Sequence, residues 1–138
     1  AQLEKFPSFV ERRRHNFDRL HKALEAVSDK LILPVPAENS TPSWFGFLIT
    51  CKEGTSKNTV VQYCEDHGVQ TRMLFAGNIT KQPVFDEMRK SGKGYRVVGD
   101  LSVTDSIMNN TFWIGVYPGM TDEMIDYMAK TIIEAVNL

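Results

Sequence analysis

One stretch of the sequence, TRMLFAGNIT (71–80), carries side chains of the types that bind small molecules. An arginine and an aromatic ring stand within a few residues of a glycine, an asparagine and a threonine. A guanidinium group binds anionic oxygens, and glycine lets a ligand or another backbone approach closely. A structural interpretation stays open, in which the asparagine forms a turn and the arginine makes a surface ion pair. The candidate binding residues are Arg72, Phe75, Gly77, Asn78 and Thr80.

A second stretch, NNTFWIGVYPG (109–119), combines asparagines with aromatic residues and adds Trp113 to the candidates. The same alternative stays open, because asparagines form turns and aromatic rings fill cores. No complete catalytic set accompanies either stretch. The three histidines are scattered, none pairs with a candidate serine nucleophile, and the glycine spacings of phosphate-binding loops are absent. The sequence therefore predicts binding residues and no catalytic residue.

Composition narrows the class of protein. The chain has 138 residues, 42% of them hydrophobic, and no internal repeat, which fits a single soluble domain, 1–138. The net charge of −1 gives no reason to expect a nucleic-acid partner. The basic run RRR (12–14) fans out around a helix, which favours a solvated face. No apolar run approaches the ~20 residues of a membrane span and no secretory signal opens the chain, so we expect a cytoplasmic protein.

The two cysteines, Cys51 and Cys64, each lie inside a periodic apolar segment. We expect two reduced and mostly buried thiols, because free cysteine is among the residues most often buried. A zinc site needs more ligands at closer spacing than this chain offers, so the sequence predicts no metal site.

Hydrophobic periodicity predicts helices that alternate with short strands. An apolar stripe indicates a leading helix within residues 1–28, with Pro7 near its start. The strand expected at 44–51, WFGFLITC, is apolar without interruption, which predicts that both of its faces are buried. Further strands are expected at 31–34, 69–75 and 112–117.

Capping signals place the other helices. Ser56 predicts the start of a helix in the middle of the chain, and Thr121 the start of the closing helix. Shorter helices are expected over 82–90 and over 104–110, the second capped by Thr104. Strands interleaved with helices argue for an α/β or α+β sandwich, in which helices cover one face of a small sheet.

Four stretches resemble the C-terminal part of one enzyme family. The family is that of the CDP-4-keto-6-deoxyhexose 3-dehydrases of lipopolysaccharide O-antigen dideoxysugar biosynthesis, which are relatives of the DegT/DnrJ/EryC1/StrS aminotransferases. The resemblance covers essentially the whole chain. The stretches are AQLEKFPSFVERRRHNF (1–17), PSWFGF (42–47), TRMLFAGNITKQP (71–83) and YRVVGDLSVTDSIMNNTFWIGVYPGMT (95–121).

The resemblance implies the aspartate aminotransferase fold (fold type I), in which a large domain binds pyridoxal phosphate (PLP) and a small C-terminal domain follows. This chain resembles the small domain, 29–138, and the helix that leads into it, 1–28. The large domain lies upstream in the family and is absent from this sequence. We therefore expect no cofactor in the fragment, whereas the resemblance implies PLP or pyridoxamine phosphate (PMP) and an iron–sulfur cluster in the parent enzyme.

In the parent enzymes the sugar loses its C3 hydroxyl group through a PMP adduct, and a partner reductase delivers electrons. The cofactor supplies this chemistry, and the protein supplies position and charge. The resemblance implies that the small domain closes over the nucleotide-sugar substrate as one wall of its pocket and is inactive alone. Relatives that transaminate carry histidines in the stretch matching 74–80, which this chain lacks. That difference favours the dehydrase branch.

A second difference concerns the substrate contact. Dehydrases of this branch carry an arginine where this chain has Ser106, and a hydroxyl group cannot replace the bidentate charged contact of arginine. Either Arg72 or Arg96 compensates, or the activity of the parent enzyme is altered. These considerations add Arg96 and Ser106 to the expected substrate-binding residues.

Two other interpretations stay open. In the first, the chain is the small domain of a nucleotide-sugar aminotransferase. In the second, it is a stand-alone binding or interaction domain that catalyses no reaction. Without its large-domain neighbour, a small domain would expose an unusually apolar patch. We therefore expect self-association and a homo-oligomer.

Overall fold

A four-stranded antiparallel sheet lies at the centre of the chain, with the strand order β1-β2-β4-β3. The computed structural model describes residues 2–138. β4 joins the two halves of the sheet, because it pairs with both β2 and β3. The strands are β1 (Leu31–Ile32), β2 (Gly46–Cys51), β3 (Thr71–Met73) and β4 (Thr111–Gly115).

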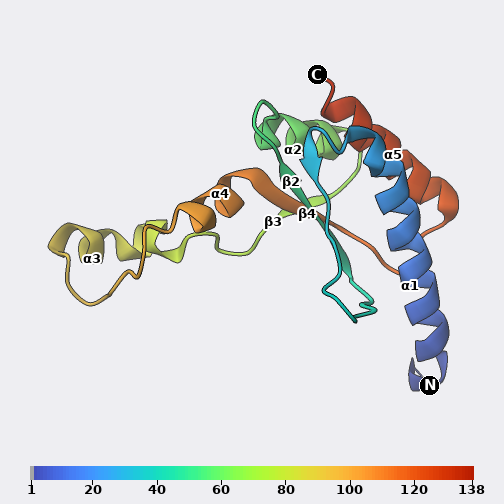
Figure 1. The fold of residues 1–138 in the computed structure, drawn as a ribbon, viewed down its shortest axis with the longest axis horizontal. Coiled ribbons are helices and arrows are strands. Elements are labelled where there is room, and N and C mark those ends of the chain that lie inside the picture. Colours follow the sequence, from blue (N-terminus) through green and yellow to red (C-terminus); the bar gives the residue numbers. More distant parts are fainter. Residues whose placement is uncertain (1) are drawn as a thin grey trace.

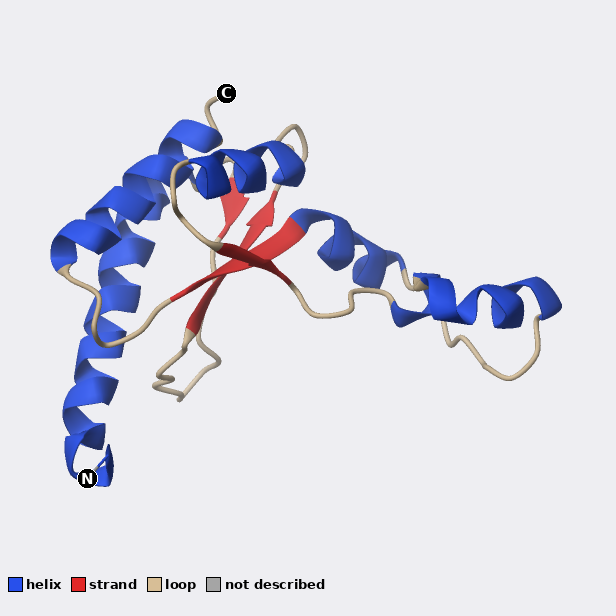
Figure 2. Cartoon of the chain, turned by 180° about the vertical axis from the view of Figure 1, so that it is seen from behind, coloured by secondary structure: helices blue, strands red, loops and turns tan. Residues whose placement is uncertain are grey.

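Three helices pack on one face of this sheet, whereas two shorter ones lie on an arm that projects away from it (Figures 1 and 2). The expected sandwich of a small sheet and covering helices is confirmed. None of the helices formed by residues 2–138 combines the length and apolar character needed to cross a membrane. The covering helices are α1 (Gln2–Leu24), α2 (Lys57–Asp66) and α5 (Asp122–Ala135), and those of the arm are α3 (Asp86–Ser91) and α4 (Ser102–Asn110).

In the register of β2 and β4, alternate side chains point into the core. Phe47 lies opposite Ile114, and Ile49 lies opposite Phe112. All four side chains are buried, at 1% exposure or less, against apolar residues of the three covering helices. The helices contribute Phe17, Leu20 and Leu24 from α1, Val60 and Cys64 from α2, and Ile125, Met128 and Ile132 from α5.

The other face of the sheet is open in this chain. Trp113 lies opposite both Leu48 and Arg72, so the three side chains share this face. Leu48 is 40% exposed, and Ile32, further along the same face, is 54% exposed. The prediction that the strand over 44–51 is buried on both faces is therefore wrong. Its uninterrupted apolar run consists of core residues that alternate with apolar residues on the uncovered face.

Two predicted helix starts are found where the capping signals placed them. The hydroxyl group of Ser56 accepts a hydrogen bond from the backbone N–H of Thr59 at 3.3 Å. The hydroxyl group of Thr121 does the same for Met124, also at 3.3 Å. Each interaction satisfies one of the N–H groups that a helix start leaves without a partner.

Three local predictions are wrong. Pro7 does not mark the start of the first helix, because α1 begins at Gln2 and includes it. Thr104 is not a cap: α4 begins at Ser102, whose N–H donates to the carboxylate of Asp100 at 2.9 Å. The helix expected over 82–90 is divided into a 3-10 turn, Pro83–Phe85, and α3.

Arginines of the basic run fasten α1 to neighbouring segments. Arg12 donates to the carboxylate of Asp122 at 2.7 Å, which ties α1 to the start of α5. Arg14 donates to the carbonyl oxygens of Thr41 and Pro42, which ties α1 to the loop before β2. Arg14 is exposed, as expected of a solvated face, and Arg12 is partly exposed. Both side chains nevertheless bind segments outside their own helix.

Both cysteines are buried and free, as expected. Cys51 ends β2 and Cys64 lies on α2, and both belong to the core. Burial raises the pKa of each thiol to about 11, which keeps both protonated at neutral pH.

Replacing Phe112 with alanine tests the packing between the sheet and the helices. We expect a loss of about 3–5 kcal/mol in the free energy of unfolding, because the ring is fully buried on the central strand. Urea unfolding followed by circular dichroism measures this loss. Val103→Ala, at an exposed position of α4, is the control and should change stability by less than about 0.5 kcal/mol. Equal losses of stability from the two substitutions would show that Phe112 is not packed in the core.

Candidate functional site

Trp113 is held on the open face of the sheet by a glycine on the neighbouring strand. A Cβ atom at Gly46 would lie 2.7 Å from Cε3 of the indole ring, so a larger residue there would displace the ring. The ring of Phe45 packs edge-on against Trp113, with a centroid distance of 5.5 Å and an interplanar angle of 87°. Such an arrangement is favourable for aromatic pairs. The sequence WFGF thus builds a fixed aromatic surface.

A cavity of about 90 Å³ lies beside this pair of rings. Side chains from the start of β2, from β4 and from the chain after β3 form its walls. None of its lining residues is charged. We call this cavity the aromatic slot; its lining residues are Trp44, Phe45, Gly46, Leu48, Leu74, Phe75 and Trp113.

Phe75 stands out among these residues by its conformation. Its φ of +48° lies in the left-handed region, which is unfavourable for a bulky L-residue by roughly 1–2 kcal/mol. The ring is also 82% exposed, so burial within this chain does not offset that cost. Residues held in such conformations cluster at functional sites. The combination points to a contact with a ligand or another polypeptide.

Arg72 supplies a positive charge next to the slot. It lies directly opposite Trp113 in the register and on the same open face. Its guanidinium group donates to the carbonyl oxygen of Thr71 at 2.8 Å, and the side chain is exposed to solvent. The open face therefore combines an apolar slot with a neighbouring cationic donor.

The residues that follow Phe75 in the sequence fasten the arm to the sheet. The side-chain oxygen of Asn78 accepts hydrogen bonds from the backbone N–H and the hydroxyl group of Thr80, at 3.1 and 2.7 Å. Its amide nitrogen donates to the carboxylate of Asp105 on α4 at 2.7 Å, and Lys81 pairs with the same carboxylate at 2.7 Å. The hydrogen bonds from Lys81 and from Asn78 lower the pKa of Asp105. We call these four residues, Asn78, Thr80, Lys81 and Asp105, the latch.

Gly77 belongs to the same junction. Its φ is +61°, and a Cβ atom there would overlap the side chain of Met108 on α4. Asn78 itself is only 2% exposed. The polar and small residues at the end of TRMLFAGN thus hold β3 and α4 together, whereas Arg72 and Phe75 face outward.

The remaining predicted residues lie elsewhere. Arg96 and Thr80 line a cavity of about 220 Å³ on the arm. Ser106 lines a third cavity, of about 520 Å³, together with Thr50 and Asn110. The structure thus brings Arg72, Phe75 and Trp113 together and places Arg96 and Ser106 in separate cavities. The expected substrate contacts of all eight residues stay predictions.

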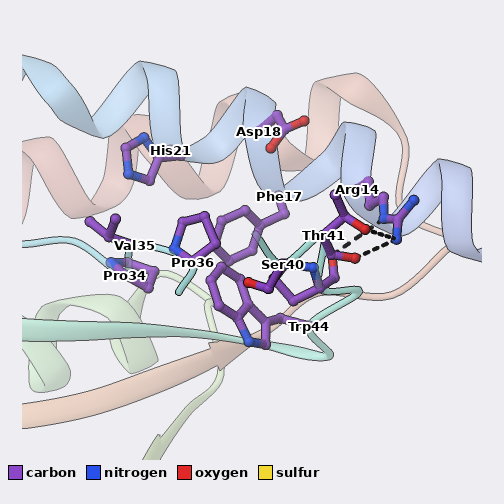
Figure 3. A pocket seen from close by; sticks show the side chains of 11 residues that line it. Arg14, Phe17, Asp18, His21, Pro34, Val35, Pro36, Ser40, Thr41 and Trp44 are labelled. Atoms are coloured by element: carbon purple, nitrogen blue, oxygen red, sulfur yellow. Dashed lines mark hydrogen bonds between the residues drawn. The ribbon is translucent and has the colours of Figure 1, made fainter. Parts of the chain in front are cut away.

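Another cavity, of about 440 Å³, lies on the side of α1 and explains how Trp44 is positioned (Figure 3). The ring of Phe17 lies 4.7 Å from that of Trp44, centroid to centroid. Arg14 fastens the preceding loop to the same helix. Trp44 lines both this cavity and the aromatic slot, so the loop's attachment to α1 also shapes the slot.

Of the residues that line the slot, the sequence singled out only Phe75 and Trp113. Trp44, Phe45 and Leu48 were interpreted as parts of a strand buried on both faces. The available signal was the glycine between aromatic residues in WFGF, since glycine inside a strand often marks the close approach of another group. Within residues 2–138, no group of three or more histidine, cysteine, aspartate and glutamate side chains has the arrangement of a metal site.

Comparison with known proteins now identifies the family. The model of the DegT/DnrJ/EryC1/StrS aminotransferase family matches residues 1–133. The chain belongs to this family. It is 47% identical over 136 residues to the lipopolysaccharide biosynthesis protein RfbH of Salmonella typhimurium, and 42% identical over 138 residues to the dTDP-4-dehydro-2,6-dideoxy-D-glucose 3-dehydratase of Saccharopolyspora spinosa. These matches cover 97% and 99% of the chain but only 30% and 29% of the length of the relatives.

Solved structures support the same fold. The chain matches the Escherichia coli GDP-4-keto-6-deoxy-D-mannose-3-dehydratase with bound hydrated PLP at a TM-score of 0.76 and 22% identity. It matches the aminotransferase TlmJ of Streptoalloteichus hindustanus at a TM-score of 0.79 and 20% identity. The matches cover 95% and 99% of this chain and about a third of each of those chains, 32% and 34%.

The open face does not form a whole PLP site by itself. A PLP site combines a phosphate-binding segment with a group that contacts the pyridine nitrogen and a residue that acts at the aldehyde carbon. The open face offers an aromatic slot of about 90 Å³, without charged lining residues, and one adjacent arginine. That set of groups does not fit the whole cofactor.

Replacing Asn78 with alanine should loosen the arm. The substitution removes three hydrogen bonds of a buried side chain, and the loss of such partners costs about 1–3 kcal/mol. When opening is fast relative to cleavage, proteolysis follows the population of the open state. We expect cleavage within residues 79–110 to become about five to a hundred times faster.

Limited proteolysis with peptide mapping measures this effect. Asn109→Ala is the matched control. Asn109 is exposed on α4, so its replacement should leave the cleavage rate unchanged. Cleavage at the wild-type rate in Asn78→Ala would show that the latch does not hold the arm.

Proposed function

We propose that this chain is the C-terminal small domain of a PLP/PMP-dependent nucleotide-sugar 3-dehydrase. In this proposal the parent enzyme removes the C3 hydroxyl group of a CDP-6-deoxy-4-hexulose in lipopolysaccharide and dideoxysugar biosynthesis. The chain contributes one wall of the substrate pocket and is inactive alone. The observation that carries the proposal is the open sheet face, on which Arg72, Phe75 and Trp113 come together.

The lengths of the relatives support a partial role. The chain spans about 30% of the length of the curated relatives that it matches, while almost all of the chain is covered. A small sheet with one face uncovered fits a domain that closes against another part of the parent protein. In this scheme residues 1–28 lead into the small domain, 29–138, and a large domain elsewhere in the parent protein holds the cofactor.

The choice between dehydration and transamination rests on the names of similar sequences and on one stretch of this chain. The names of the relatives at 42%, 28% and 26% identity each include a 3-dehydratase activity. The structures named as aminotransferases share the fold at 20% identity or less. The stretch 74–80 also lacks histidine. Together these observations favour the dehydrase over the aminotransferase.

Further components belong to the same proposal. The parent enzyme uses PLP or PMP together with an iron–sulfur cluster, and a partner reductase delivers the electrons. The parent protein is cytoplasmic and forms a homo-oligomer. Exposed apolar residues outside the aromatic slot support association: Ile32 on the sheet, and Val84 and Val98 on the arm.

The decisive experiment uses the full-length protein that contains this chain. Supplied with PMP, a reductase and CDP-6-deoxy-4-hexulose, it should release a sugar that has lost the C3 oxygen, as mass spectrometry would show. With PLP and glutamate it should form no amino sugar. An Arg72→Gln variant should lose activity at least about tenfold, since a charged contact to substrate is worth roughly 1.5–3 kcal/mol.

Two controls accompany this assay. Arg72→Lys keeps the charge and should retain more activity than Arg72→Gln, and residues 1–138 alone should show no absorbance from bound PLP after dialysis. An amino sugar as the main product would overturn the proposed reaction in favour of transamination.

A further inference from the structure

We propose that the aromatic slot binds the C6 methyl group of the sugar and sets a preference for 6-deoxy over 6-hydroxy substrates. The residues assigned to this selectivity are Leu48, Leu74 and Phe75. The inference rests on the proposed function, which supplies a nucleotide-linked 6-deoxyhexose as the substrate.

The size of the slot indicates that it takes only part of a ligand. Whole-ligand sites usually enclose roughly 300–1,000 Å³, whereas the slot has about 90 Å³. A nucleotide sugar is far larger than this cavity. One small group of the substrate therefore enters the slot, and the rest of the substrate lies outside it.

The walls of the slot indicate which group that is. Four aromatic residues, two leucines and a glycine form them, and none of these side chains is charged. The carbon skeleton of a 6-deoxy-4-hexulose carries hydroxyl, keto and phosphate oxygens around the ring, and its C6 methyl group is its apolar end. The methyl group is thus the part of the sugar that suits these walls.

The neighbouring charge fits the same orientation. Arg72 lies across from Trp113 on the open face, outside the lining of the slot, and its guanidinium group donates to the carbonyl oxygen of Thr71. A sugar with its methyl group in the slot turns its oxygen-bearing groups outward, where this guanidinium group can bind a phosphate or keto oxygen. The slot and the arginine thus make complementary contacts to opposite ends of one sugar unit.

The conformation of Phe75 is explained by this role. A left-handed residue turns the chain sharply after β3 and brings the ring to the slot wall. An exposed ring gains burial once a ligand covers it. A C6 hydroxyl group in the same place would lose water and find no charged or carboxamide partner among the lining residues.

The expected selectivity is limited in size. A hydrophobic pocket discriminates against an analogue that adds one hydroxyl group by about a hundredfold at most. We therefore expect CDP-6-deoxyglucose to inhibit the full-length enzyme about 10 to 100 times more strongly than CDP-glucose. The two inhibitors differ only in the oxygen atom at C6.

Two substitutions test the slot in the full-length protein. Leu48→Thr places a hydroxyl group in the wall and keeps a residue that favours strands. Phe75→Asn places an amide there and replaces phenylalanine with a residue that adopts the left-handed region readily. Each should lower the ratio of the two inhibition constants at least threefold. Ile32→Thr is the matched control, because Ile32 lies on the same face but outside the slot, and it should leave the ratio unchanged.

The outcomes separate this inference from the proposed function. Turnover of CDP-6-deoxy-4-hexulose with a ratio that neither slot variant changes overturns the methyl-group assignment alone. Equal weakening of both inhibitors also overturns it and indicates that the slot packs against protein. A full-length protein that turns over no CDP-6-deoxy-4-hexulose overturns the proposed function, and the assignment with it. Thermal unfolding of each variant shows that a changed ratio comes from a folded protein.

Discussion

The antiparallel pairing of β2 with β4 is the constraint on which the rest of the structure depends. Because the pairing sets Phe47 against Ile114 and Ile49 against Phe112, one face of the sheet is committed to the core beneath the helices. The same register leaves Leu48 and Trp113 on the opposite face. A shift by one residue would exchange the two sets. Core formation and the composition of the open face are therefore consequences of one register.

Some residues around the open face hold its side chains in position, and others point outward, where a ligand can reach them. Gly46 makes room for the indole ring of Trp113, and the loop held by Arg14 sets the place of Trp44. On the other side of the slot, the latch around Asn78 joins the chain after β3 to α4. These buried or internal contacts leave the outward groups, Arg72 and Phe75, available to a ligand.

Local rules predicted much of this fold from the sequence. Apolar periodicity located the strands and the covering helices, and the capping residues Ser56 and Thr121 marked two helix starts. The rules failed where tertiary context decides. WFGFLITC reads as a strand buried on both faces, because no local signal shows that one of its faces stays uncovered in this chain. Thr104 resembles a cap but lies inside α4, and the carboxylate of Asp100 accepts the hydrogen bond from the N–H of Ser102 at the start of that helix.

The candidate site was predictable in part for similar reasons. Arg72, Phe75 and Trp113 were recognisable by residue type, and the register then brought them together. Asn78 has the same polar character, yet its side chain is used within the chain, since its partner Asp105 lies 27 residues further along. The sequence contains no indication of that pairing. The distinction between outward and inward polar groups required the three-dimensional structure.

Hydroxyl-radical footprinting of the full-length protein tests the central claim most directly, namely that the open face forms a wall of the substrate pocket. The solvent reactivity of aromatic residues would be compared with and without CDP-6-deoxyglucose. The account predicts that Phe45, Phe75 and Trp113 become protected, whereas Tyr127, exposed on α5 across the sheet, keeps its reactivity. Unchanged reactivity of all three open-face residues at a saturating ligand concentration would contradict the account.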